Sequence, residues 1–345
     1  MPKAVESTLA GQPDKMCDQI ADAIVDEYLR RDPKAQVDIN VLGAHGMLMI
    51  AGEVDSTADF DCGALAAQVY KEIGYAEEIQ VFVNLGERSP AMKEARARPS
   101  DTVVLTGYAT RETREMLPRA LVYAHTIARR VDELRNTDPA FQWLMPDGKV
   151  QLVMEGARVQ SVTVLASHRD FIEPKDVQAA ILDRVLNPVI GEEGAQVFVN
   201  PLGKFIVAGF AGDAGASGHK LSVDLYGGLI PSSDASLSGK DPGKVERAGT
   251  YMARAAARYV VAEGLAESAV VNVAYSLGRA EPVHLQVRGL AEKSRGAKMD
   301  LTNLIKQKFD FRPEAIVERL DLLRPIYFKT ACYGHVGREE FPWET

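Results

Sequence analysis

Apolar residues recur along the chain with two periods, one typical of amphipathic helices and one typical of strands. The first five patterned segments have the order helix, strand, strand, helix, strand: 13–31, 36–42, 47–54, 61–73 and 79–85. Pro13 suits the first turn of the first helix, and Asp32-Pro33 ends that helix. The pattern therefore predicts a small α/β unit at the start of the chain.

The same order of patterns returns twice. The second set is strand, helix, two strands, helix and strand: 102–107, 118–136, 149–155, 158–167, 174–187 and 196–200. The third set is two strands, helix, two strands and helix: 204–209, 221–227, 243–263, 270–277, 282–289 and 300–309. A recurring element order indicates an internal repeat, and helices that cover sheets indicate an α+β fold. The alternating strands leave one sheet face free, and that face could pack on another subunit.

Breaks in these patterns divide the chain into units at 1–90, 102–202 and 203–345, with a connection at 91–101. The stretch 89–101 is rich in basic residues and has no apolar period. Two interpretations of it stay open, a mobile lid over a ligand site or an inter-domain linker.

Glycine-rich segments between 209 and 247 carry the strongest chemical signal. They read GFAGDAGASGHK, DLYGGLIPSSDAS and SGKDPGKVER. Glycines let several backbone N–H groups point at one anion, and the lysines among them add positive charge. The spacing matches neither a Walker A loop nor a dinucleotide fingerprint. We interpret these segments as phosphate-binding loops of another fold, with glycine-rich surface turns as the alternative.

Composition narrows the function classes. The chain has 345 residues and a formal net charge of −8, which argues against a nucleic-acid binder. Its cysteines, Cys17, Cys62 and Cys332, are widely spaced and fit thiols in a reducing compartment. We find no signal-peptide pattern and no apolar run of membrane-spanning length. We therefore expect a cytoplasmic protein with no membrane partner.

A series of motifs in fixed order resembles the methionine adenosyltransferase (S-adenosylmethionine synthetase) family. The motifs are ESTLAGQPDKMCDQIADAIVDEYL, GEV around Glu53, TGYATRET, LMPDGKVQ, the three glycine-rich loops and ACYGHVGREEFPWE. The resemblance implies three β-α-β-β-α-β units related by pseudo-threefold symmetry. It also implies a homodimer, or a dimer of dimers, with active sites at the subunit interface.

In the family reaction, the sulfur of methionine attacks C5′ of ATP and displaces triphosphate, which is cleaved to pyrophosphate and phosphate. A thioether has no proton to lose, so catalysis depends on positioning and on charge stabilisation rather than on a general base. The resemblance therefore implies ATP and a small amino-acid-like acceptor as ligands, with Mg²⁺ as cofactor.

The resemblance also assigns roles to single residues. Catalytic roles fall on Gln12, Lys15, Lys149, Lys220 and Lys240. ATP contacts fall on Asp147, Lys149, Lys204, Phe205, Asp213, His219, Lys220 and Lys240. Acceptor contacts fall on Glu53, Arg88, Asp101, Asp213 and Lys244, and metal ligation on Asp14 and Glu246. For any one of them, a surface ion pair is the alternative.

Several of these positions depart from the family pattern. Gln12 replaces a histidine that helps to stabilise the leaving triphosphate, His219 and Lys204 replace arginines, and Arg88 replaces a glutamine that contacts methionine. An acidic residue linked to K⁺ is Asn40 here, which speaks against K⁺.

The departures leave three hypotheses open: the ordinary reaction, transfer to a different, more anionic acceptor, or a catalytically weak nucleotide-binding partner subunit. We expect Arg88 to face an anion, either Glu53, Glu87 or Asp101 of the protein or a carboxylate of the acceptor.

Overall fold

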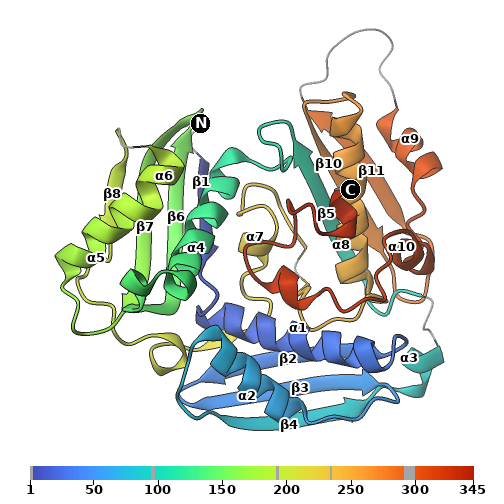
Figure 1. Cartoon of the computed structure of the whole chain (residues 1–345). Helices are drawn as coiled ribbons and strands as arrows, with labels where there is room; N and C mark the ends of the chain where they lie inside the picture. Colours follow the sequence, from blue (N-terminus) through green and yellow to red (C-terminus); the bar gives the residue numbers. More distant parts are fainter. Residues whose placement is uncertain (1–2, 95–97, 192–193, 234, 291–299) are drawn as a thin grey trace.

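Three β-sheets, each with helices on one face, make up the computed structural model (Figure 1). It describes residues 3–94, 98–191, 194–233, 235–290 and 300–345. Within these ranges, no helix is long and apolar enough to cross a membrane. The structure confirms the predicted α+β class, with helices and sheets in separate layers.

The first sheet has the strand order β4-β3-β2-β9, and helices α1 and α2 cover it. Its elements are α1 (Pro13–Arg31), β2 (Gln36–Ala44), β3 (Met47–Asp55), α2 (Cys62–Ile73), β4 (Gln80–Glu87) and β9 (Gly215–Ala216). A short helix, α3 (Pro90–Glu94), follows β4 at the start of the expected lid or linker. The rest of that prediction falls partly on 95–97, which lie outside the described residues.

The second sheet has the order β1-β6-β7-β8, and the third has the order β11-β10-β5. The second is built from β1 (Lys3–Thr8), α4 (Arg119–Thr137), β6 (Leu144–Glu155), β7 (Arg158–His168), α5 (Pro174–Ile181), α6 (Asn187–Ile190) and β8 (Gln196–Val199). The third is built from β5 (Val103–Thr110), α8 (Val245–Ala262), β10 (Ser268–Tyr275), β11 (His284–Leu290), α9 (Leu301–Lys308) and α10 (Pro313–Arg319).

Strands are exchanged between the three sheets. β1 precedes α1 in the chain but pairs with β6, β5 precedes α4 but pairs with β10, and β9 precedes α8 but pairs with β2. Each of these pairings is antiparallel. Because each sheet contains a strand from another part of the chain, the three sheets fold as one interlocked body.

Two predicted strands are wrong. Residues 204–209 form no strand, because side chains bind their backbone N–H groups: His168 Nε2 accepts from Phe205 at 3.2 Å, and Asp147 Oδ2 accepts from Gly209 at 2.9 Å. The segment 221–227 begins instead with the short helix α7 (Leu221–Asp224), which local i to i+4 hydrogen bonds close. The strand β1 and the helix α10 were not predicted.

Four aspartates spaced four residues apart form one stripe along α1: Asp14, Asp18, Asp22 and Asp26. All four are buried. Their carboxylates accept backbone N–H bonds of 2.8–2.9 Å from Ala216, Gly218, Gly239 and Tyr327, in that order. In Figure 1, α1 lies between the β2–β4 sheet and the segments that contain α7 and the C-terminal region. The stripe therefore anchors these loops to the helix.

The third aspartate of the stripe also holds α8. Asp22 Oδ2 accepts a hydrogen bond of 2.7 Å from Arg247 Nη2, and both side chains are fully buried. Arg247 also donates to the Lys240 carbonyl at 2.7 Å, and its guanidinium lies 4.3 Å from the centre of the Tyr327 ring. Burial raises the pKa of Asp22, and the charge of Arg247 opposes that rise.

We predict that Asp22→Ala lowers the free energy of unfolding by about 3–5 kcal/mol, because it leaves the Arg247 charge buried without its partner. Urea denaturation followed by circular dichroism measures this change. Asp183→Ala, at an exposed aspartate, is the matched control and should stay within about 0.5 kcal/mol of the wild type. A loss for Asp22→Ala as small as that of the control would contradict the anchoring role.

The fourth aspartate predicts a pH dependence. Burial raises the pKa of Asp26 to about 6, although the N–H groups of Phe328 and Tyr327 oppose the rise. A carboxyl with a higher pKa in the folded state binds its proton more tightly there than in the unfolded chain. The stability of the wild type should therefore increase relative to Asp26→Asn as pH falls from about 7 towards about 4. Denaturant titrations at several pH values test this, and an opposite slope would refute it.

Candidate active site

Two of the three predicted phosphate loops, 209–220 and 238–247, lie along the edge of β2 that is opposite β3. In one, Ala216 pairs with Leu42, and Ser217 N–H donates to the Val41 carbonyl at 2.9 Å. In the other, the Gly239 carbonyl accepts from Ile39 N–H at 2.9 Å, and Lys240 forms a β-bridge with Asp38. Both loops therefore pair with the same edge of β2, although they are separate in the sequence.

The first loop presents its cations to the N-terminus of α1. Lys220 Nζ donates to Asp14 Oδ2, and His219 Nδ1 lies 3.2 Å from Asp14 Oδ1. Burial raises the pKa of Asp14, but hydrogen bonds from Lys220, Ala216 and Gln12 outweigh it and hold the pKa below its usual range. Asp14 was predicted as a metal ligand and His219 and Lys220 as ATP contacts, and the structure brings the three side chains together.

Gln12 uses both ends of its side-chain amide. Its Oε1 accepts from Lys15 N–H at 3.1 Å, which caps α1, and its Nε2 donates to Asp14 Oδ2 at 3.0 Å. Gln12 therefore orients the carboxylate that also binds Lys220. A local cap of this kind follows from the side-chain amide and the Pro13 that begins the helix.

The loop 238–247 presents two further lysines. Lys240 Nζ lies 3.0 Å from Glu246 Oε1, and Lys244 Nζ donates to Asp38 Oδ2. Glu246 is 1% exposed, and its Oε2 has no hydrogen-bond partner among the described residues. A buried carboxylate oxygen with no donor is suited to a cation. Asp38 was not predicted from the sequence. It lies opposite Glu53 in the β2–β3 register, which the sequence alone does not show.

A third group surrounds Asp147 on β6. Burial raises the pKa of Asp147 to about 6, with the Gly209 and Gly148 N–H groups lowering it and the charge of Asp213 raising it. Asp213 itself is exposed, and its side chain accepts from Ala214 N–H at 2.8 Å. The structure thus places Asp147, Asp213 and the start of the first loop in one region.

Of the remaining predicted nucleotide residues, Lys149 lies on the second sheet, and Lys204 and Phe205 follow its last strand, β8. Lys204 Nζ is 2.7 Å from Asp170 Oδ1, and Phe205 bonds through its backbone to His168. Lys149, on the uncovered face of that sheet, is 2.6 Å from Glu6 Oε2. These are ion pairs on partly exposed side chains, so their lysines can exchange partners when an anion binds.

Lys15, for which the resemblance implies a contact with phosphate or amino acid, is buried in this structure. Its side chain is 1% exposed, and its Nζ binds Asp18 at 2.9 Å and also Asp224. Burial raises the pKa of Asp224 to about 7, with the Lys15 charge opposing that rise. The buried ammonium serves as the counter-charge of two carboxylates within the fold.

The predicted acceptor residues do not form a single cluster among the described residues of one chain. Arg88 Nε lies 3.9 Å from Glu53 Oε2, and its Nη1 donates to Gln36 Oε1. Of the three carboxylates expected beside Arg88, Glu53 is thus the one that pairs with it, at long range. Asp101 is exposed and binds the N–H of Thr102. Asn40 is exposed on β2.

The metal ligands predicted from the sequence are likewise in different groups. Asp14 binds Lys220, and Glu246 binds Lys240. Across the described residues, no three acidic, histidine or cysteine side chains form a cluster that could hold a metal. The donor types nevertheless fit Mg²⁺, which proteins commonly bind through one or two carboxylates together with substrate phosphates.

Comparison with known proteins identifies the class of protein to which these features belong. Residues 3–90 match the N-terminal domain, 97–205 the central domain and 207–345 the C-terminal domain of S-adenosylmethionine synthetase. An S-adenosylmethionine synthase of Sorangium cellulosum is 39% identical over 98% of this chain and 86% of its own length. One of Deinococcus radiodurans is 38% identical over 98% of this chain and 94% of its own length. The chain belongs to the S-adenosylmethionine synthetase family.

Proposed function

We propose that the protein is an ATP-dependent methionine adenosyltransferase that forms S-adenosylmethionine. The sulfur of methionine forms a bond to C5′ of ATP while the bond from C5′ to the triphosphate oxygen breaks. The triphosphate is then hydrolysed to pyrophosphate and phosphate. The observation that supports this best is that two separate glycine-rich loops, which carry Lys220 and Lys240, pair with one edge of β2. The family of the chain supports the same reaction.

The lysines supply the charge that this reaction needs. Triphosphate is a highly charged leaving group, and fixed cations that are already in place stabilise its departure without reorganisation. Lys220 and Lys240 are each held by a carboxylate, Asp14 and Glu246. Lys149 and His219 add cationic groups, His219 only when it is protonated.

Asp14 and Glu246 are the residues that we propose to hold Mg²⁺. When bound, Mg²⁺ neutralises phosphate charge. The low pKa of Asp14 keeps its carboxylate ionised at neutral pH, and Glu246 has a free buried oxygen among its described surroundings. Asp147, Asp213, Lys204 and Phe205 are proposed to contact the nucleotide. Glu53, Arg88, Asp101, Asp213 and Lys244 are proposed to contact the acceptor.

The strand exchange supports three repeated units at 1–90, 102–202 and 203–345, joined by 91–101, with pseudo-threefold symmetry. In each sheet, the exchanged strand pairs antiparallel with the strand that follows the covering helix: β9 with β2, β1 with β6, and β5 with β10. The strand after the helix also pairs antiparallel with the next strand in every case: β2 with β3, β6 with β7, and β10 with β11. A cyclic order of this kind is what a threefold repeat requires.

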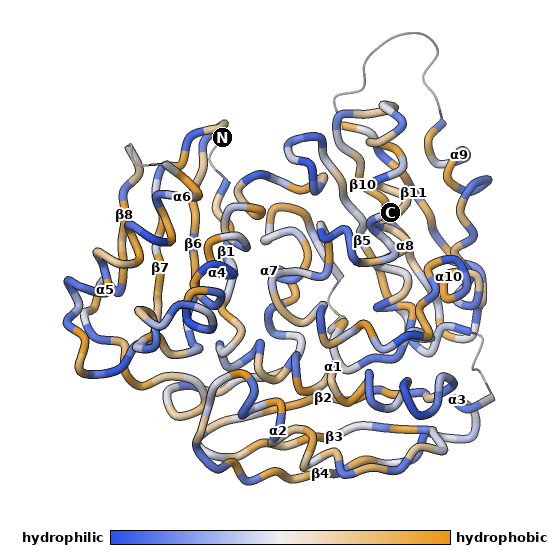
Figure 2. The backbone as a smooth tube through the Cα atoms, viewed as in Figure 1, coloured by the Kyte–Doolittle hydropathy of each residue, from blue (hydrophilic) through white to orange (hydrophobic). Residues whose placement is uncertain are grey.

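The uncovered face of the first sheet supports a homodimer or a dimer of dimers. The strand register places Leu42, Met49 and Phe82 in one row across β2, β3 and β4. All three are exposed, at 55%, 42% and 39%. Figure 2 shows that hydrophobic residues run along these strands. A contiguous apolar row on a flat sheet face is typical of a subunit interface.

Identification of the reaction products tests the proposed activity. Protein incubated with ATP, Mg²⁺ and methionine should yield the sulfonium product together with pyrophosphate and phosphate, detected by mass spectrometry. Reactions without methionine or without Mg²⁺ are the controls. Release of phosphate without a sulfonium, or the absence of both products, would contradict the proposal.

We predict that Lys240→Ala weakens Mg²⁺-dependent ATP binding roughly tenfold to a hundredfold, because it removes a charge-assisted contact to phosphate. Isothermal titration calorimetry measures the affinity. Lys175→Ala, at an exposed lysine of α5, removes the same charge elsewhere and should bind as the wild type does. Equal ATP affinity for both variants would remove Lys240 from the site.

For the assembly, we predict that the wild type has at least a dimeric mass in light scattering at micromolar concentration. Met49→Glu places a charge in the centre of the apolar row and should shift the mass towards the monomer. Ala64→Glu introduces the same charge at an exposed position on α2, the covering side, and should leave the mass unchanged. A monomeric wild type would refute the interface.

A further inference from the structure

The segment from Lys240 to Lys244 is attached to β2 at both of its ends, and Asp38 takes part in both attachments. The backbone of Asp38 forms a β-bridge with Lys240. Its side chain accepts, at Oδ2, a hydrogen bond from Lys244 Nζ. A backbone bridge does not depend on the side chain, whereas the ion pair requires the carboxylate. Replacing the side chain therefore changes the placement of Lys244 and leaves the bridge to Lys240 in place.

Lys244 is a nearly buried cation whose ammonium is held by one carboxylate. Its side chain is 6% exposed, and that of Asp38 is 31% exposed. Among the described residues, the hydrogen-bond acceptor of this ammonium is Asp38. A lysine ammonium carries three N–H donors, so donors stay available for a ligand. An ammonium buried to this extent is stabilised by a fixed counter-charge, which Asp38 supplies.

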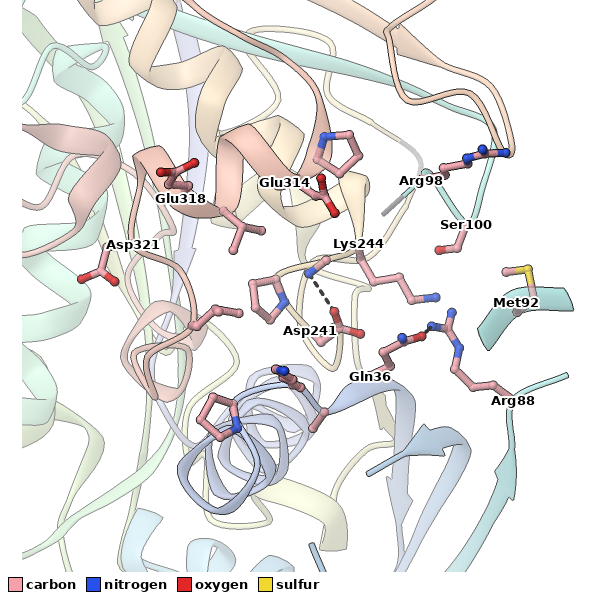
Figure 3. Close-up of a pocket in the computed structure, with 18 residues that line it drawn as sticks. Gln36, Arg88, Met92, Arg98, Ser100, Asp241, Lys244, Glu314, Glu318 and Asp321 are labelled. Carbon is pink, nitrogen blue, oxygen red and sulfur yellow. Dashed lines mark hydrogen bonds between the residues drawn. The ribbon is translucent and has the colours of Figure 1, made fainter. Parts of the chain in front are cut away.

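Lys244, unlike Asp38, lines a cavity of about 690 Å³. In Figure 3, the side chain of Lys244 extends towards Gln36 and Arg88, which also line this cavity. Arg88 is 6% exposed, and its Nε has no hydrogen-bond partner among the described residues. Asp38 reaches Lys244 from outside the cavity lining. It can therefore orient this cation without contacting a ligand in the cavity.

A second carboxylate, Asp241, competes for the same cation. Its two oxygens accept from backbone N–H groups at 2.7 Å each. Burial raises the pKa of Asp241, and these N–H groups, followed by the charges of Lys244 and Arg88, oppose the rise. Both cations are therefore within electrostatic reach of Asp241. A Lys244 ammonium without Asp38 can turn towards Asp241 and away from its present position.

We propose that Asp38 is a positioning residue of the acceptor site, whose carboxylate fixes the Lys244 ammonium where it and Arg88 bind the carboxylate of methionine. The inference rests on the proposed function, because Arg88 and Lys244 belong to the proposed acceptor set. Lys220 and Lys240 show the same arrangement, each held by one carboxylate.

Two effects of removing Asp38 oppose each other. The site gains net positive charge, which favours an anion. It also gains a free four-carbon side chain, which must be ordered again when the ligand binds. Because Asp241 offers the freed Lys244 ammonium another partner, we expect the loss of position to outweigh the gain in charge.

Methionine binding tests the inference by calorimetry, in the presence of Mg²⁺ and a non-hydrolysable ATP analogue. Asp38→Ala should weaken methionine binding roughly tenfold, and Asp38→Asn, whose amide oxygen still accepts from the ammonium, should fall between it and the wild type. Asp55→Ala removes an aspartate from the same sheet face, where it pairs with Lys93 at 3.5 Å, and should bind as the wild type does. Unchanged or tighter methionine binding in Asp38→Ala would overturn the proposal.

A double-mutant cycle shows whether Asp38 acts through Lys244. In the Lys244→Ala background, Asp38→Ala should change methionine affinity by less than about twofold, because the side chain that Asp38 positions is gone. Losses that multiply would show a separate role and contradict the assignment. Asp38→Ala should bind the ATP analogue as the wild type does, because the bridge to Lys240 remains. An equal loss of analogue affinity would mean that Asp38 holds the whole loop, and the inference would be wrong.

Steady-state kinetics separates the inference from the proposed function. We expect Asp38→Ala to raise the apparent KM for methionine roughly tenfold and to leave kcat within about twofold of the wild type. A fall in kcat with KM unchanged would refute the positioning role. A wild type that binds methionine but forms no sulfonium would overturn the proposed function alone, since the binding cycle still tests Asp38. A wild type that binds no methionine would overturn both.

Discussion

The stripe of aspartates on α1 is the constraint on which the rest of the structure depends. Four carboxylates on one helical face are buried, and a buried carboxylate is tolerated only with donors or a cation beside it. Backbone N–H groups of Ala216, Gly218, Gly239 and Tyr327 meet that requirement. The phosphate loops pair with β2 over only a few residues, so the helix contributes to fixing where they lie. The phosphate loops are therefore positioned in part by the buried face of the first helix.

The partners of the aspartates differ between the two ends of α1. The aspartates near the C-terminal end stabilise the fold, whereas Asp14 at the N-terminal end belongs to the candidate active site. Towards the C-terminal end, Asp22 pairs with the fully buried Arg247. Asp26 accepts hydrogen bonds from backbone N–H groups, and burial raises its pKa to about 6. At the N-terminal end, Asp14 pairs with Lys220, whose side chain is 22% exposed, and its pKa is lowered. A partly exposed cation can bind an incoming anion. The end of α1 that carries the positive pole of the helix dipole is thus the end open to a ligand.

Periodicity predicted what depends on neighbours in sequence. The helix at 13–31 and the strand pair that follows it were visible because their signals lie within one segment. The pairing of β1 with β6 could not be predicted in this way, because the paired residues are more than a hundred positions apart in the sequence. The glycine-rich segments pointed to Lys220 and Lys240. The resemblance assigned Lys15 to a ligand, and its buried ion pairs with Asp18 and Asp224 became visible only in the packing. Arg88 was expected beside an anion; its long contact with Glu53 depends on the tertiary fold.

Gln12 shows how a departure from the family pattern can be compatible with the proposed chemistry. A neutral amide cannot supply positive charge to triphosphate, but it donates and accepts at the same time. Here one end of the amide caps α1 and the other holds Asp14, which in turn holds Lys220. The contribution of Gln12 is then to the geometry of the Asp14–Lys220 pair, and the positive charge comes from the lysines. Because electrostatic catalysis depends on groups that are fixed in advance, such a positioning residue can support the reaction without touching the charge that develops.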